Sequence, residues 1–264
     1  MINTQQVGVV GHSQFKANAT LGNNNAGFHN SIYRGKKLGT AVSADQFTAI
    51  GDGSFDGMFI GDYWEITYNN VARIFRIAAF DYWLHNGDTE CTTHHVLIVP
   101  DDKLCEAKMN NSNITTGGYV GSDFYTGNNS NTGKSDALAI VNGSFGSGHI
   151  LEHKNLLSNA VASGVASGWA WYASKLELMS ESMVYGSPVA GARKADDTNF
   201  NIGIDNSQLP LFAYDHSRIC NRGSWWLRDV VSSTGFARVD ASGVANGSYA
   251  SYSHGIRPAF AIIA

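Results

Sequence analysis

The sequence predicts a mixed α+β protein with a mostly antiparallel sheet, short helices and long ordered loops. Charged residues make up only 15% of the chain, and glycine contributes 29 of the 264 residues. This composition is typical of a loop-rich β or α+β protein and not of a helical bundle. Short runs of aromatic and branched residues are bounded by turn residues, as strands are. Helical periodicity is confined to a few brief segments.

The N-terminal part of the chain predicts an arm, residues 1–40, ahead of a single domain that covers residues 41–264. The first 31 or so residues are polar and rich in Asn and Gly, so they cannot bury enough apolar surface to fold alone. They are either flexible or ordered against a neighbouring subunit. A short helix should follow, with Ser43 as its N-cap and Gln46 completing a capping box.

The middle of the chain predicts a hairpin and a further buried strand. Residues 65–68 and 71–83 flank a turn at Asn69-Asn70, and residues 95–100 form an apolar run that ends in proline. Such runs bounded by turn residues are typical of strands. We expect one or two helical turns over residues 104–109.

The next segments alternate between loop and short helix. From residue 115 to 148 the chain is dominated by Gly, Asn, Ser and Thr, which predicts a long ordered loop with one short helix or strand. Residues 149–162 show apolar residues at helical spacing. Residues 176–184 fit either a strand that enters a helix or one short helix.

Two buried strands are predicted near the C-terminal end, on either side of a polar span. Trp225-Trp226-Leu227 and residues 260–263 are short and apolar, and residues 236–243 alternate as a hairpin strand does. Neighbouring side chains on a strand point to opposite faces, so we expect one tryptophan ring in the core and the other outward or under a loop. Residues 246–254 lack any such pattern and predict an exposed loop.

This exposed loop is the predicted ligand-binding surface. Tyrosine supplies contact area at low entropic cost, and Ser and Asn adapt their hydrogen bonds. The residues that we expect to contact a ligand are Asn246, Ser248, Tyr249, Ser251, Tyr252 and His254.

The C-terminal residues also carry a resemblance. Residues 225–228 and 255–260 form a WWLR…GxRPAF ending, which resembles the C-terminal motif of DUF6273-type domains in bacterial and phage proteins. Those domains are similar in turn to the C-type-lectin-like fold of formylglycine-generating enzymes and of retroelement variable proteins. Further stretches resemble phage structural proteins from Gram-positive hosts, namely residues 34–39, 55–64, 116–122 and 178–186.

The resemblance implies a C-type-lectin-like domain in a non-enzymatic virion protein, made in the bacterial host cytoplasm and exposed on the phage head or tail. It implies three kinds of partner: other virion proteins of the capsid or tail, sister subunits in a homo-oligomer that we expect to be a trimer, and a glycan or protein of the host surface. We expect the assembly surface to include Arg34, Lys36, Lys37, Tyr63 and Trp64. One alternative is a decoration protein that cements capsid subunits and binds no ligand.

A second alternative is a zinc hydrolase. His149-Ile-Leu-Glu152-His153 matches the H-x-x-E-H pattern, in which two histidines one helical turn apart bind zinc and the glutamate is the general base. Glu177 or Glu181 would supply a third protein ligand. We weigh this pattern against capping or surface histidines, and we expect no catalytic residue, no metal and no cofactor.

Cysteine content and charge exclude other classes. Cys91, Cys105 and Cys220 are an odd number without metal-ligand spacing, which predicts three reduced thiols. A formylglycine-type oxidase would use paired cysteines near the C-terminus, where only Cys220 lies. The net charge of −4 without a basic block argues against nucleic-acid binding. We expect no signal peptide and no membrane span, because neither a cationic start before an apolar core nor a long apolar run is visible.

Overall fold

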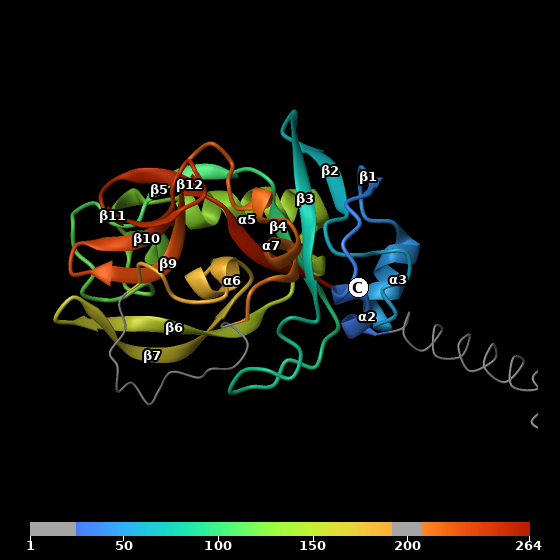
Figure 1. The fold of residues 1–264 in the computed structure, drawn as a ribbon, viewed down its shortest axis with the longest axis horizontal. Helices are drawn as coiled ribbons and strands as arrows, with labels where there is room; N and C mark the ends of the chain where they lie inside the picture. The colour runs from blue at the N-terminus through green and yellow to red at the C-terminus, as the bar shows by residue number, and fades with distance from the viewer. Residues whose placement is uncertain (1–24, 192–206) are drawn as a thin grey trace, which may run out of the picture.

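The larger sheet of the molecule has six strands and lies around the middle of Figure 1 and toward its right-hand end. The computed structural model describes residues 25–191 and 207–264. The strand order of this sheet is β1-β2-β3-β4-β13-β8. The strands span Lys37–Gly39 (β1), Tyr63–Tyr68 (β2), Val71–Phe80 (β3), Val96–Pro100 (β4), Pro258–Ile262 (β13) and Glu177–Leu178 (β8).

A five-stranded sheet forms the other end of the molecule, and a two-stranded hairpin runs along one side of it (Figure 1). The order in the five-stranded sheet is β11-β10-β9-β12-β5, so β11 and β5 are its edges. Its strands span Ala245–Tyr249 (β11), Gly235–Val239 (β10), Trp225–Ser232 (β9), Ser253–Ile256 (β12) and Cys105–Lys108 (β5). The hairpin consists of β6 (His153–Ala162) and β7 (Val165–Ser174).

The helices are short. The α-helices span Ala26–Asn30 (α2), Ala44–Gly51 (α3), Asp123–Thr126 (α4), Gly133–Phe145 (α5), Glu181–Tyr185 (α6) and Pro210–Tyr214 (α7). The 3-10 turns span Asn128–Ser130 (η1), Ser147–His149 (η2) and His216–Arg218 (η4). Serine caps begin three of the helices: the hydroxyls of Ser43, Ser122 and Ser180 each accept a hydrogen bond from a backbone N–H of the first turn.

One continuous hydrophobic core joins the two larger sheets. Phe75 of β3, Phe145 of α5 and Phe260 of β13 form a cluster of edge-to-face rings, with centroids 5.0 to 6.0 Å apart. This is a preferred geometry for aromatic pairs. The cluster fastens α5 onto the sheet, and through β13 it ties the end of the chain to the centre of the molecule.

Several predicted elements are confirmed. β2 and β3 form the predicted hairpin, and Asn69 and Asn70 both have positive φ, as a tight two-residue turn between antiparallel strands requires. The predicted capping box of α3 is present. Residues 176–184 form a strand that enters a helix, β8 followed by α6, and β4, β9, β10 and β13 lie where buried or hairpin strands were expected.

Three segments differ from the prediction. Residues 104–109 and 149–162 contain the strands β5 and β6 instead of helices, and residues 246–254 form most of β11 and β12 instead of a loop. In β6 the buried positions alternate at His153, Asn155 and Leu157, so polar side chains occupy core positions and hide the two-residue period. β5 pairs with β12, which is remote in the sequence, and long-range pairing overrides weak local preference. The 115–148 segment also carries a longer helix than expected, the 13-residue α5.

Both tryptophans of the WWLR motif are fully buried. Neither ring points outward to solvent, so that alternative of the prediction is wrong. β9 is a central strand whose two faces are both covered. The indole Nε1 of Trp226 donates to the carbonyl of Ala107 at 2.9 Å, and that of Trp225 donates to the carbonyl of Ile219. Each ring therefore has the polar partner that a buried indole needs.

The described part of the predicted arm packs against the domain of the same chain. Residues 1–24 lie outside the described part of the chain. In α2, the ring of His29 is buried, and the side-chain amide of Asn30 exchanges two hydrogen bonds with the backbone of Phe80. β1 then pairs in parallel with β2. Residues 25–40 thus contribute to the six-stranded sheet and its covering.

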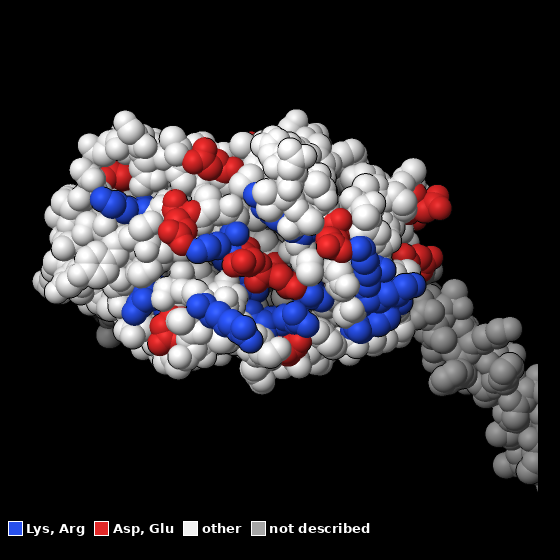
Figure 2. All heavy atoms as spheres, turned by 90° about the horizontal axis from the view of Figure 1, so that it is seen from above, with Lys and Arg blue, Asp and Glu red and all other residues white. Residues whose placement is uncertain are grey.

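Charges are interspersed on the face shown in Figure 2. Acidic and basic side chains alternate across its middle, and a group of basic side chains lies at the end where β1 is seen in Figure 1. Cys91, Cys105 and Cys220 are free thiols, as predicted. Within residues 25–191 and 207–264, no helix is both long and apolar enough to cross a membrane.

Candidate functional site

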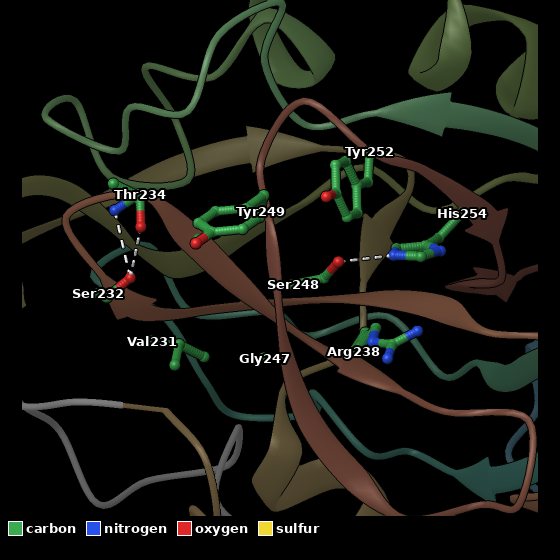
Figure 3. Close-up of a pocket in the computed structure, with 10 residues that line it drawn as sticks. Val231, Ser232, Thr234, Arg238, Gly247, Ser248, Tyr249, Tyr252 and His254 are labelled. Carbon is green, nitrogen blue, oxygen red and sulfur yellow. Dashed lines mark hydrogen bonds between the residues drawn. The ribbon is translucent and has the colours of Figure 1, made fainter.

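A groove of about 440 Å³ opens on the five-stranded sheet, where the β10–β11 hairpin meets the turn into β12 (Figure 3). Pockets for small molecules fall in this size range. Its lining residues come from four neighbouring strands, β9 to β12, and the turns between them: Val231, Ser232, Thr234, Gly235, Arg238, Gly247, Ser248, Tyr249, Tyr252 and His254.

The hairpin register brings these side chains together. β10 and β11 pair with Gly235 opposite Tyr249 and Phe236 opposite Ser248. At Gly247 a Cβ atom would lie 3.0 Å from Val231 Cγ1, which is tighter than ordinary contact. A side chain at position 247 would therefore press against Val231, which lies two strands away in β9.

Two exposed tyrosines stand at the rim of the groove. Tyr249 and Tyr252 are 51% and 54% exposed, and their rings meet edge to face at 5.6 Å. The turn between them is anchored by the buried Ala250, whose N–H donates to the carbonyl of Thr234 and whose carbonyl accepts from two backbone N–H groups. The rings are therefore presented by a fixed backbone, although they are half open to solvent.

A polar group occupies the other end of the groove. His254 Nε2 lies 2.8 Å from Ser248 Oγ, and the imidazole packs edge-on against Trp226, 4.5 Å between centroids. Burial of the imidazole, together with the positive charge of Arg238, lowers the pKa of His254 to about 4. His254 is consequently neutral near pH 7 and acts as a hydrogen-bonding group.

The chemistry of the groove suits binding better than nucleophilic catalysis. A Ser–His pair activates serine only if the histidine can take its proton, and a base with a pKa near 4 is weak at neutral pH. Hydroxyl groups, a neutral imidazole and exposed phenol rings instead offer hydrogen bonds and flat apolar faces. In ligand pockets, groups of this kind fix the orientation of a small polar molecule.

The predicted ligand residues are only partly brought together. Ser248, Tyr249, Tyr252 and His254 line the groove, whereas Asn246 and Ser251 are not among its lining residues. The β9 and β10 side of the groove was not predicted, although alternation along β10 gives Arg238 a definite face. The neighbours of Arg238 follow from the pairing of β10 with β11, which the sequence did not reveal.

The predicted assembly residues lie around a buried carboxylate. Asp62 is fully buried, and its oxygens accept hydrogen bonds from the guanidinium of Arg34 and from the backbone N–H groups of Lys36 and Phe59. The side chain of Lys37 pairs with Glu65 at the surface. Two of the three expected cations are thus already engaged with acidic groups of this chain.

The two aromatic members of the predicted assembly surface differ in exposure. Trp64 is fully buried, and its Nε1 donates to the side chain of Gln46 at 3.0 Å. Tyr63 is partly exposed, with the guanidinium of Arg76 above its ring at 4.7 Å. Only Tyr63 of this pair offers surface to a partner.

The H-x-x-E-H residues do not share a helical face. His149 lies in η2, where its ring stacks on Phe47 at 4.0 Å, whereas His153 begins β6 and stacks on Trp83 at 3.7 Å. Glu152 between them is exposed. Two histidines bind one zinc ion across a helical turn only when both project from that helix, and this geometry is not formed.

The proposed third ligands are committed elsewhere. Glu177 pairs with Lys134, and the carboxylate of Glu181 accepts three hydrogen bonds from the backbone N–H groups of residues 189–191. No group of three or more His, Cys, Asp or Glu side chains in the described ranges is placed to hold a metal ion.

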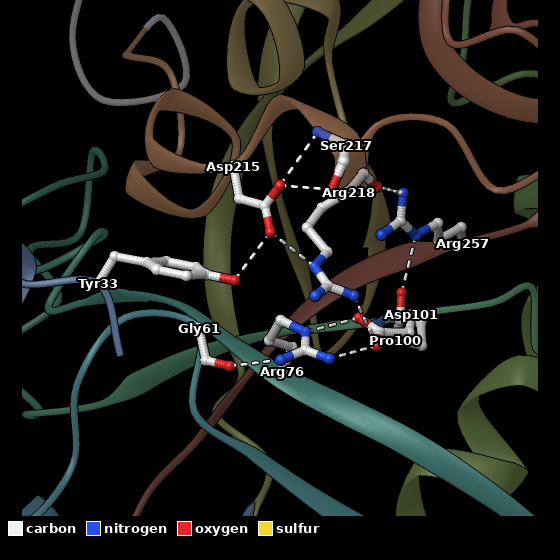
Figure 4. A network of polar contacts seen from close by, with 9 residues as sticks. All are labelled: Tyr33, Gly61, Arg76, Pro100, Asp101, Asp215, Ser217, Arg218 and Arg257. Atoms are coloured by element: carbon white, nitrogen blue, oxygen red, sulfur yellow. Dashed lines mark hydrogen bonds and ion pairs between the residues drawn. The ribbon is translucent and has the colours of Figure 1, made fainter. Parts of the chain in front are cut away.

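The arginine of the GxRPAF motif is a structural residue. Arg257 is fully buried, with its guanidinium 5.0 Å from the ring centroid of Trp225 and 5.5 Å from that of Phe212. It donates to the carbonyls of Pro100 and Arg218 (Figure 4). Burial lowers the pKa of Arg257 to about 10, so the side chain stays charged near pH 7 and holds β4 and η4 against β13.

A network of polar contacts beside Arg257 connects Tyr33, in the N-terminal part of the described chain, to the region of η4 (Figure 4). The phenol of Tyr33 donates to Asp215, which also accepts from Arg218. Arg76 forms a two-pronged pair with Asp101 and donates to the carbonyl of Gly61. Paired hydrogen bonds of this type give directional strength, so distant parts of the chain are held in register here.

These observations define the class of the protein, which is an α+β domain with an open groove that has two tyrosines at its rim. A DUF6273 domain, "Domain of unknown function (DUF6273)", is found at residues 164–264, and every residue that lines the groove lies within it. Searches of curated proteins and of solved structures found no match. The matched region starts in the β6–β7 turn, so three of its strands, β7, β12 and β13, pair with strands that precede it.

Proposed function

We propose that this chain is a non-enzymatic binding protein of a phage virion surface, and that its groove takes a saccharide of the host surface. The observation that carries the proposal is the pair of exposed tyrosines, Tyr249 and Tyr252, beside the Ser248–His254 hydrogen bond. Phenol rings offer flat faces to the C–H side of a sugar, and the polar pair offers hydrogen bonds to its hydroxyls.

The size and openness of the groove support a short glycan over a folded protein as the ligand. A volume of about 440 Å³ accommodates a mono- or disaccharide, whereas a stable protein interface typically buries roughly 800 Å² on each partner. The rings are held by the backbone contacts of Ala250, so little conformational freedom is lost when a ligand binds.

The virion location and the C-type-lectin-like fold are parts of the same proposal. They rest on the resemblance of the WWLR…GxRPAF ending and of the four upstream stretches to phage proteins. Mixed α+β architecture with mostly antiparallel pairing is compatible with a lectin-like domain. In this proposal Lys36 and Tyr63 contribute to contacts with other virion proteins or with sister subunits of a trimer.

A glycan array with the purified full chain tests the binding part of the proposal. We expect Tyr249→Ala and Tyr252→Ala each to weaken binding of the selected glycan about tenfold, the loss expected for an important interface aromatic. Tyr214→Ala is the matched control, because Tyr214 is 49% exposed and does not line the groove. Binding that is unchanged in both groove variants would contradict the proposal.

Cryo-electron microscopy of the particle tests the location. We expect density for this chain on the particle exterior, with the groove facing solvent. Density on the capsid lattice with the groove closed against shell subunits would favour a decoration protein instead. Absence of the chain from every particle would sink the virion proposal while leaving the saccharide result to stand alone.

A further inference from the structure

Arg238 forms no close ion pair in the described ranges. Backbone hydrogen bonds chiefly lower the pKa of the nearby carboxyl of Asp240, and the charge of Arg238 contributes to this lowering. Arg34, Arg76 and Arg218 each form an ion pair with an aspartate. Within residues 25–191 and 207–264 no such pair joins Arg238 to Asp or Glu, and its Nη1 donates a hydrogen bond to the hydroxyl of Ser224 at 2.7 Å.

The guanidinium is also incompletely hydrogen-bonded. Its Nε is buried without an acceptor, and a buried N–H that lacks a partner is unfavourable. Nη2 makes no hydrogen bond to any described residue. Nη2 is not buried, so it is the N–H group of this guanidinium that can reach a carboxylate or phosphate, the anions that arginine binds through charge-assisted hydrogen bonds.

Arg238 is one of the residues that line the groove. Arg238 lies in β10 opposite Trp226 of β9, and Trp226 packs against His254. Figure 3 shows Arg238, Ser248 and His254 together at one end, while Val231 and Tyr249 lie toward the other. The groove therefore has its cation at one end, whereas Val231, Tyr249 and the hydroxyl groups of Ser232 and Thr234 lie at the other.

We propose that the saccharide bound by the groove carries a negatively charged substituent, a carboxylate or a phosphate, and that Arg238 binds it while Ser248 contributes a hydroxyl hydrogen bond. This inference rests on the proposed function. The sugar ring then lies toward Tyr249 and Tyr252, and the charged group fills the acceptor position that the guanidinium lacks. A single cation suits one charged substituent, whereas a nucleic-acid backbone needs several.

Calorimetric titration of the full chain with three matched saccharides tests the proposal. The three share one glycan core and carry, at the same position, a hydroxymethyl group, a carboxylate or a phosphate. We expect at least one charged form to bind tenfold or more tightly than the neutral form, and the two charged arms identify which group is preferred. The advantage should shrink as salt is added.

Substitutions locate the effect. Arg238→Gln should remove the preference for the charged saccharide and leave the affinity for the neutral one within about twofold, whereas Arg238→Lys should retain part of the preference. Arg73→Gln is the control, because Arg73 donates only to backbone carbonyls in the β2–β3 hairpin. Circular dichroism of each variant checks that the fold is intact.

The outcomes separate the two proposals. If the neutral saccharide binds as tightly as both charged forms, or if Arg238→Gln weakens all three equally, the charge inference is overturned and saccharide binding stands. If none of the three binds, both proposals are overturned. If an acidic peptide binds to the chain and none of the saccharides does, the groove takes a different class of ligand. The saccharide proposal and the charge inference are then both overturned.

Discussion

His153 shows what burial does to a titratable side chain in this protein. Its ring stacks on Trp83, and neither ring nitrogen has a hydrogen-bond partner. Desolvation, with a further contribution from the positive charge that His95 and Arg228 would place beside it, lowers the pKa of His153 to about 3. His95, also buried, has its pKa lowered chiefly by desolvation.

Acid should therefore destabilise the fold at this residue. In the unfolded chain His153 takes up a proton near pH 6.5, whereas in the folded chain it stays neutral down to about pH 3. The free energy of unfolding should be unaffected by His153 above pH 6.5 and should fall between pH 6.5 and 3. The loss is about 1.4 kcal/mol per pH unit, or about 2 kcal/mol at pH 5. Urea denaturation at a series of pH values measures it.

Two variants isolate the contribution of His153. His153→Phe keeps a ring against Trp83 and removes the titration of this residue, so it should reduce the pH dependence between pH 6.5 and 5 by the share of His153, while His95 and His254 keep theirs. His216→Gln changes an exposed histidine of η4 and should leave the dependence as it is. An unchanged slope in His153→Phe would assign the acid sensitivity to other groups.

Among the elements, the connection of residues 25–40 to the β2 strand depends on one glycine. Gly61 has φ +83°, and a Cβ atom there would lie 2.4 Å from the ring of Tyr33. Tyr33 in turn donates to Asp215, so the ring is not free to move away. The N-terminal segment can therefore lie on the sheet only if position 61 carries no side chain.

Gly61→Ala should lower the free energy of unfolding by about 2–4 kcal/mol, because backbone strain and overpacking add. Gly57→Ala is a matched control, since Gly57 has φ +75° but no atom within 4 Å of the added Cβ. It should cost only the strain, about 1 kcal/mol. Thermal and urea unfolding of the two variants compare these values, and equal losses would show that the Tyr33 contact is unimportant.

Some helices and strands of this protein are determined by the residues within them, and others are determined by their partners in the sheet. The β2–β3 hairpin and α3 were predictable because their turn and cap residues, Asn69-Asn70 and Ser43 with Gln46, carry the signal themselves. β5 and β12 were not, because each gains strand conformation from the other, which is distant in sequence. β11 pairs with the neighbouring strand β10, but its residues Asn246, Gly247 and Ser248 lack the apolar alternation of a strand. For the candidate site this meant that Ser248, Tyr249, Tyr252 and His254 were identified by composition, whereas Arg238 needed the hairpin register.

For the whole molecule, the region matched to DUF6273 is not a separate folding unit. β7, β12 and β13 take their partners β6, β5 and β4 from residues before 164. Without them, three strands would expose unpaired backbone edges, which promote aggregation. The core is likewise shared, since Phe260 packs on Phe75 and Phe145.

Expression of residues 164–264 alone should therefore give aggregated or unfolded protein without a cooperative unfolding transition. Residues 25–264 form the matched control, because this fragment keeps every described strand pair, and it should unfold cooperatively near the transition of the full chain. Amide NMR dispersion and circular dichroism melting make the comparison. A soluble, cooperatively melting 164–264 fragment would contradict the shared core.

The turn that carries Tyr249 and Tyr252 is fixed by main-chain contacts of Ala250. Its shape thus depends little on which side chains flank the buried alanine. Exchanging residues 249, 251 and 252 should alter what is recognised without unsettling the scaffold. In the proposed binding role, ligand specificity and the stability of the fold would then be separable traits of this surface.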